Sequence, residues 1–331
     1  MADRCFINSI AQVSCQKPLC DEWFDTPETF SGDFIRAQEP VAKDVIPAAE
    51  ARRMGRILKR AICTSLHALK ESKIQIPDAI VTGTAMGCME NSEKFLIDLS
   101  NLGENCLKPT LFMQSTHNTI SSLIAIFLKC HGYNNTYSHK GISFESALLD
   151  AWLLIRQGAI NNALVGAHDE VTPIMSRVLK TTHPEYSFIS ETSVSAVLSS
   201  EASADNLCEV ERVELFNNPS VEDLADSING DSPQVLVVGM NGIELNDHHY
   251  LNLIEHLKPT PIIAVYKNIF GDNFSSSALG FYSGVMILKK QYLPDFMLRN
   301  NIGKPDSEIK SLAILNHSEA KNWGLIRLKK F

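Results

Sequence analysis

The feature of this chain that most constrains its fold is the alternation of short apolar runs with longer amphipathic stretches. An apolar run of about four to eight residues indicates a buried strand, and apolar residues at helical spacing indicate a helix packed on a core. The predicted strands are Cys5–Val13, Ile80–Thr82, Ala163–Gly166, Val235–Val238, Pro261–Val265 and two more around Ile314 and Ile326. The predicted helices are Ala48–Leu69, Asn118–Lys129, Ser143–Gln157, Asp247–Leu257 and Ser275–Leu288. This alternation predicts an α/β fold in which helices cover a largely parallel sheet.

The middle of the chain carries two apolar segments with no helix between them, Ser193–Leu198 and Glu209–Phe216. They predict an antiparallel excursion from the parallel pattern. The order of predicted elements before about residue 200 is similar to the order after it, and no long linker separates the two parts. We therefore expect a single domain over residues 1–331, built from two similar halves at about 1–200 and 201–331.

Charge and cysteine content exclude several classes of function. The net charge of −8 argues against nucleic acid or an anionic membrane as the main partner. No stretch approaches about 20 apolar residues, and no basic segment followed by an apolar run precedes the first strand, so we expect a cytoplasmic protein. The eight cysteines show neither a CxxC pair nor a zinc-like spacing, which predicts reduced thiols and no metal or cofactor.

Residues 114–173 carry the strongest family signal. They contain an apolar helix, Gly132, a short strand, a tight turn, a second helix and Gly158, followed by Ala163-Leu-Val-Gly166. This order resembles the central segment of β-ketoacyl synthases, in which the turn bears the nucleophile. Three further pieces follow in the family's order: Phe188–Leu198 resembles "F-x-x-GEGAG-x-L", Glu244–Asp247 the end of "HGTGT-x-x-x-D", and Tyr266–Asp272 "K-S-x-x-G-H".

The resemblance spans about residues 50–328 and implies a thiolase-like fold. In that fold two similar βαβαβαββ halves form stacked mixed sheets in an αβαβα layering. The family's chemistry needs a cysteine thiolate at a helix N-terminus and two histidines that support decarboxylation. Counting from the flanking motifs places the nucleophile at Gly141 and the two histidines at Gly239 and Asp272. The resemblance therefore implies that the chain has no condensing activity of its own.

Parts of the family pattern remain. Glu191 matches the glutamate of "GEGAG", which is a buried structural carboxylate in the family, and Lys267 matches the lysine of "K-S-x-x-G-H". We expect Lys267 to form an ion pair with Asp272 or with Glu191. Residues 315–324 occupy the region of the family's glycine-rich loop, with most of the glycines replaced. A loop of this composition cannot supply the family's second oxyanion-hole N–H group.

Two residues near the turn leave an alternative open. Ser143 opens a helix in a context that partly resembles a nucleophile elbow, although Glu145 replaces the last glycine of G-x-S-x-G. Ser143 with His139 as a base would make an acyl-thioester hydrolase on the same fold. The alternatives are that Ser143 caps the helix and that His139 has only a packing or hydrogen-bonding role.

The helix Asn118–Lys129 is apolar on more than one face, as expected for a core helix or a subunit contact. In ketosynthases the corresponding helix and the strand after it lie at the dimer interface. The resemblance thus implies that residues 117–145, with His117, Tyr133, Tyr137 and Phe144 as the named candidates, form a partner contact and the end of an acyl tunnel.

Our leading hypothesis from the sequence is a non-catalytic subunit of the chain-length-factor type, similar to the ketosynthase-like proteins of aryl-polyene and flexirubin pathways. It would pair with an active ketosynthase served by an acyl carrier protein. A homodimer, and a stand-alone module that binds acyl groups or carrier protein, remain as alternatives.

Overall fold

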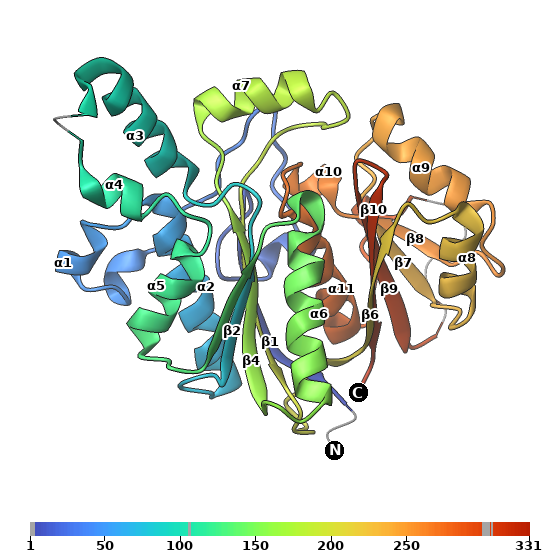
Figure 1. Ribbon diagram of the computed structural model, residues 1–331. Helices are drawn as coiled ribbons and strands as arrows, with labels where there is room; N and C mark the ends of the chain where they lie inside the picture. The colour runs from blue at the N-terminus through green and yellow to red at the C-terminus, as the bar shows by residue number, and fades with distance from the viewer. Residues whose placement is uncertain (1–3, 105–106, 300–304, 306) are drawn as a thin grey trace.

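The computed structural model describes residues 4–104, 107–299, 305 and 307–331 (Figure 1). Its strands are β1 (Phe6–Val13), β2 (Ala79–Gly83), β3 (Tyr133–Tyr137), β4 (Asn162–Asp169), β5 (Thr192–Ser199), β6 (Cys208–Asn217), β7 (Val235–Val238), β8 (Ile262–Val265), β9 (Ser311–Ser318) and β10 (Asn322–Lys329). Its α-helices are α1 (Ala48–Ala51), α2 (Arg56–Ser72), α3 (Met89–Leu102), α4 (Pro109–Met113), α5 (Thr119–Leu128), α6 (Ser143–Arg156), α7 (Pro173–Thr182), α8 (Val221–Asn229), α9 (Glu244–Ile254), α10 (Lys267–Phe270) and α11 (Ser276–Lys290). The α/β class predicted from the alternation is confirmed.

The strands form a continuous sheet in the order β3-β2-β4-β5-β1-β6-β10-β9-β7-β8. If the strands of each half are numbered from one to five, the first half has the order 3-2-4-5-1 and the second half the same order reversed. The first strands of the halves, β1 and β6, meet through the pairs Phe6–Glu209 and Ile7–Cys208. The two halves are therefore arranged about a local twofold relation at this seam.

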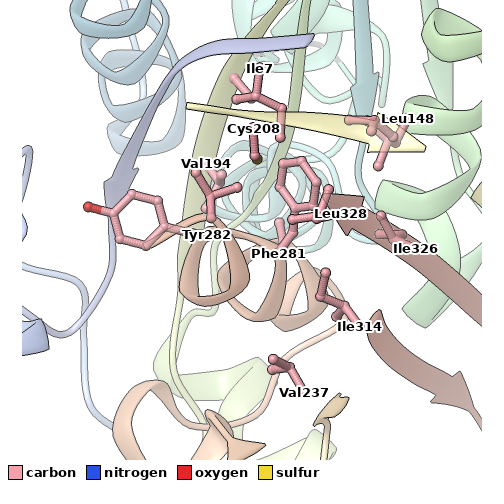
Figure 2. Close-up of a cluster of buried hydrophobic side chains, with 14 of the residues drawn as sticks. Ile7, Leu148, Val194, Cys208, Val237, Phe281, Tyr282, Ile314, Ile326 and Leu328 are labelled. Carbon is pink, nitrogen blue, oxygen red and sulfur yellow. The ribbon is translucent and has the colours of Figure 1, made fainter. Parts of the chain in front are cut away.

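Helices make the remaining layers. One helix from each half, α6 and α11, packs between the two five-stranded parts, where the largest hydrophobic core lies. Figure 2 shows this core, with Leu148 of α6 and Phe281 of α11 among side chains of β9 and β10. The opposite face of the first half is covered by α2 and α5, and that of the second half by α8 and α9 (Figure 1). The succession is α, β, α, β, α.

The antiparallel strands expected over residues 193–198 and 209–216 are present as β5 and β6. They do not pair with each other, because β1 lies between them and pairs antiparallel with both. One prediction about a helix was wrong. The helix expected over residues 48–69 is divided into α1 and α2, because Gly55 takes an extended conformation and becomes the N-cap of α2. Propensity and periodicity predicted where this helical region begins and ends, but not the break between α1 and α2.

Several helices were not predicted from the sequence. In α3 the only buried residue is Asn91, so this helix shows no stripe of buried apolar positions for periodicity to detect. The helix α8 carries a capping box formed by Ser220 and Asp223, a local signal that precedes an apolar stripe. Within the described residues, no helix is long and apolar enough to cross a membrane.

Candidate functional site

Gly141, the position predicted for the nucleophile, lies in a turn of 3₁₀ helix immediately before α6. Its N–H donates to Ser318 Oγ (3.3 Å), and its carbonyl accepts from Asn316 Nδ2 (2.8 Å). An ion pair between Lys140 and Glu319 (2.7 Å) adds a third link between the same two segments. A Cβ at Gly141 would lie 3.1 Å from Ser318 Cβ. The turn between β9 and β10 is thus bonded directly onto the position where the nucleophile is expected.

Gly239, the first histidine position, follows β7 and has even less room around it. A Cβ there would lie 2.6 Å from the hydroxyl of Tyr250, 3.2 Å from that of Tyr266 and 3.2 Å from Lys267 Cε. Both tyrosines are fully buried. The volume that a side chain at residue 239 would need is therefore filled by two tyrosine hydroxyls.

Asp272, the second histidine position, is a buried acceptor. Its carboxylate lies 3.0 Å from Lys267 Nζ, so of the two expected partners Lys267 pairs with Asp272. The same carboxylate accepts from the Ser187 N–H (2.8 Å) and from Asn241 Nδ2 (2.9 Å). These bonds fix two loops on either side of α10, which is a structural task.

Glu191 forms a different buried ion pair, with Arg60 Nη2 at 3.0 Å, and both side chains are fully buried. It also accepts from the N–H groups of Ala37 (2.9 Å) and Val171 (3.2 Å). A carboxylate with these partners holds α2, the loop of Ala37 and the end of β4 together. Removal of Arg60 would leave the buried Glu191 carboxylate uncompensated, whereas Arg60 has a second partner in Glu39.

A cavity of about 360 Å³ opens beside Gly141. Its lining includes Lys267, the β9–β10 turn and the end of β9 with Asn316 and His317. Polar and aromatic side chains from three other segments complete it, namely His183, Tyr186, Asn246, His249, Asn273, Phe274 and Ser276. Gly141 and Lys267 were singled out from the sequence, and Asn246, Asn316 and His317 lie in segments matched there to family motifs. The remaining lining residues were not predicted, because the fold brings them together from segments far apart in the chain. Among the described residues, no group of three or more His, Cys, Asp or Glu side chains could hold a metal ion.

Comparison with known proteins decides the family. Residues 22–212, more than half of the chain, match the family model of the β-ketoacyl synthase N-terminal domain. The chain belongs to the β-ketoacyl synthase family. A 140-residue segment is 26% identical to 3-oxoacyl-[acyl-carrier-protein] synthase 2 of Synechocystis sp., covering 40% of this chain and 34% of that protein. The match thus spans about a third of that relative's length.

Solved ketosynthase structures have the same fold over the full chain. An acyl-carrier protein in complex with its type II polyketide ketosynthase, AntDE:AntF, matches with a TM-score of 0.82 at 15% identity, covering 100% of both chains. The ishigamide ketosynthase/chain length factor matches at 0.80 and 16%, covering 99% of both chains. The ketosynthase ApeO in complex with its chain length factor ApeC from Xenorhabdus doucetiae matches at 0.79 and 13%, covering 99% of this chain and 98% of that one. The predicted thiolase-like ketosynthase fold is confirmed.

The pairing of Ser143 with His139 that a rebuilt ketosynthase site would need is not formed. Ser143 is fully buried, and its hydroxyl donates to the Lys140 carbonyl (2.7 Å) and accepts from the His139 backbone N–H (2.8 Å). The exposed His139 places Nδ1 2.9 Å from Ser146 Oγ instead. Ser143 thus closes the preceding turn, and it does not cap the following turn of α6 as an N-cap would.

The candidate contact residues divide between surface and core. His117 is exposed, with Nε2 3.1 Å from the Ala85 carbonyl oxygen. Tyr133 is 41% exposed and donates to the Asp150 carboxylate, and Tyr137 is partly buried. Phe144 was placed wrongly at this surface. It is fully buried, with its ring 5.2 Å from that of Phe281, because the first turn of α6 faces α11.

A buried carboxylate that was not predicted from the sequence, Glu145, lies in the first turn of α6, next to the turn of Gly141. Glu145 accepts from Ser277 Oγ (3.1 Å) and from Asn316 Nδ2 (3.1 Å). Burial raises the pKa of this carboxyl to about 7, and these hydrogen bonds only partly oppose the effect. In the sequence Glu145 stands among serines in the first turn of α6, where an acidic residue is common at the surface, so the sequence does not indicate its burial.

Proposed function

We propose that this chain is a non-catalytic ketosynthase-like subunit that pairs with an active β-ketoacyl-ACP synthase in chain elongation of the fatty-acid or polyketide type, in the cytoplasm. One observation carries the proposal. The three positions that match the family's cysteine and histidines hold Gly141, Gly239 and Asp272, and a Cβ added at either glycine would meet a neighbouring side chain, at 3.1 Å for Gly141 and 2.6 Å for Gly239. We further propose that residues 1–331 act as one domain with pseudo-halves 1–200 and 201–331.

The chemistry follows from these residues. A condensing enzyme carries its acyl group on a thiolate, and a glycine has no side chain to take it. The Asp272 carboxylate only accepts hydrogen bonds when ionised, so it cannot donate to an enolate oxygen as a histidine does. The site therefore has no side chain to carry the acyl group and no histidine to stabilise the enolate.

The open edge of the sheet supports association with a partner. Within the described residues β3 pairs with β2 alone, and its sequence Tyr-Asn-Asn-Thr-Tyr contains neither the charges nor the proline that usually guard an edge strand. Apolar side chains are exposed on the neighbouring helices, including Ile126 of α5 (71%) and Leu153 of α6 (40%). We propose that this surface contacts the partner and that His117, Tyr133 and Tyr137 shape the end of its acyl tunnel.

The solved relatives suggest the kind of partner. Two of them are described as a ketosynthase with a chain length factor, and a third as an acyl-carrier protein with its ketosynthase. By analogy we propose an active ketosynthase subunit and an acyl carrier protein as partners of this chain. An acyl-thioester hydrolase with Ser143 and His139 has no support in the geometry, because the two side chains have different partners.

Co-expression with an active ketosynthase from the same organism tests the proposal. We expect a 1:1 complex by size-exclusion chromatography with light scattering, and condensation of malonyl-carrier substrate that is lost when the partner's nucleophilic cysteine is replaced. The same activity should survive Ser143→Ala in this chain. A chain that forms only homodimers, or that hydrolyses acyl thioesters by itself and loses that activity in Ser143→Ala, would overturn the proposal.

A further inference from the structure

We propose that the cavity beside Gly141 binds a small carboxylate with a planar, unsaturated body, held without any covalent bond. This inference goes beyond pairing and tunnel shaping, and it does not depend on them. It rests on three features of the cavity: an aromatic wall, a buried donor without a partner, and rim carboxylates that already have partners of their own.

The wall is made of three rings. His183 stacks on Tyr186 with a centroid distance of 4.8 Å and an interplanar angle of 15°. Phe274 stands edge-on to His183 at 5.3 Å. All three line the cavity. A flat ligand offers offset and edge contacts to such a wall, whereas a saturated chain uses only part of it.

The donor is His317. Its Nδ1 accepts from the Ala320 N–H (3.3 Å), which places the ring proton on Nε2. Burial and the nearby Lys267 ammonium lower the pKa of His317 to about 3, so the ring is a neutral donor. The backbone carbonyl of Asn246 acts on the pKa of His317 in the opposite direction. No group among the residues that the structure describes meets hydrogen-bond geometry with the buried Nε2. A buried donor left unpaired is costly, and an oxygen of a bound carboxylate would satisfy it.

The two acidic side chains in the cavity lining already have partners. Glu185 Oε1 lies 2.8 Å from His183 Nδ1, a hydrogen-bond contact, and Glu319 forms an ion pair with Lys140 (2.7 Å). The partly buried His249 lies next to His317, with ring centroids 5.4 Å apart, and offers a second imidazole. An entering carboxylate therefore meets acidic groups that are already engaged, and imidazoles that can donate to it.

Calorimetric titration with trans-cinnamate tests the inference on the full chain, or on its complex with the ketosynthase if the chain is obtained only in that form. We expect one site per chain with a dissociation constant of about 1 mM or tighter. Cinnamyl alcohol, which lacks the carboxylate, and cyclohexanecarboxylate, which lacks the planar body, should each bind roughly tenfold more weakly. Equal binding of all three compounds, or none by cinnamate, would overturn the inference.

Variants locate the site. His317→Leu should weaken cinnamate binding roughly tenfold, and His249→Gln should weaken it as well, whereas the exposed His256→Leu should leave it unchanged. His249→Gln keeps the test valid if His317→Leu fails to fold. Binding that requires a cinnamoyl group attached to carrier protein, with no binding of the free acid, would also contradict a free-carboxylate site. Pairing with the ketosynthase is measured by size-exclusion chromatography and cinnamate binding by calorimetry, so failure of the pairing proposal and failure of the cavity proposal are told apart.

Discussion

The two halves of this molecule share one strand order but differ at their outer edges. The edge strand of the first half, β3, is exposed over Tyr133 and Asn134 and pairs on one side only within the described residues. The edge strand of the second half, β8, is buried along its length. Leu298 bridges to Ala264, and the Arg299 N–H donates to the Ile263 carbonyl (2.9 Å), so a loop covers this edge.

The difference shows how a duplicated framework can divide its tasks. An unpaired edge strand is a ready site for another chain, and a covered one is not. One half therefore leaves its sheet edge open within the described residues, whereas a loop covers the edge of the other half. The helices α6 and α11, one from each half, meet in the shared core and tie the two halves together.

The largest effect is expected where the halves meet. Phe144→Ala should lower the free energy of unfolding by about 3–5 kcal/mol, because it removes a fully buried ring that contacts Phe281 of the other half. Leu153→Ala on the same helix should cost less than about 1 kcal/mol, because Leu153 is 40% exposed. Chemical denaturation of both variants measures the contrast, and equal losses would show that the core does not hold the halves together.

The next effect tests the two edges against each other. Lysines at Tyr133 and Asn134 of β3 should weaken association with the partner by about 3 kcal/mol, roughly 100-fold, without lowering the melting temperature. Thr260→Lys, an exposed position just before β8, is the matched change at the other edge and should have no effect on association. Sedimentation velocity compares the two proteins. Weakening by the β8 change alone would reverse the assignment of the edges.

The two glycines of the degenerate site allow a smaller comparison. Gly239→Ala should destabilise the chain by about 2 kcal/mol, because its Cβ would lie 2.6 Å from the Tyr250 hydroxyl. Gly141→Ala should cost about 1 kcal/mol or less, because its Cβ would lie 3.1 Å from Ser318 and the small serine side chain can adjust. Thermal unfolding of both variants gives the order. A tolerated alanine at 239 would mean that the tyrosines do not fill the site.

The smallest effect concerns pH. The pKa of Glu145 is raised from 4.5 to about 7, so the folded chain holds this proton more tightly than the unfolded chain does. This contribution is most favourable below pH 4.5, declines as the pH rises to about 7, and levels off above that. Between pH 6 and pH 8 the wild type should lose about 1 kcal/mol relative to Glu145→Gln, which cannot ionise. Parallel denaturation curves of the two proteins at both pH values measure it, and a constant difference would contradict the raised pKa.

Most of the fold could be predicted from sequence because its signals are local. The strands β7 and β8 are short, wholly apolar runs, and α6 begins and ends within a residue of the prediction. Strand pairing is a non-local property. The sequence gives no sign that β1 separates β5 from β6, because that arrangement depends on contacts between residues about 190 positions apart in the chain.

The site could be predicted only in part. Family motifs predict that Gly141, Gly239 and Asp272 stand at the catalytic positions, and the structure adds what lies around them. Nothing in the sequence near Gly239 shows that the hydroxyls of Tyr250 and Tyr266 converge on it. The cavity wall of His183, Tyr186 and Phe274 was missed for the same reason, since these rings come from separate segments.

The central position of β1 has a consequence for how this protein is made. Both neighbours of β1 are encoded much later, at residues 193–199 and 208–209. At about 5–20 residues per second, a ribosome needs roughly 10–40 s to reach them after it has passed β1. During that time an apolar strand that will lie in the middle of the sheet has neither of its final partners. We therefore expect nascent chains of this protein to expose β1 to chaperones until synthesis has passed residue 209.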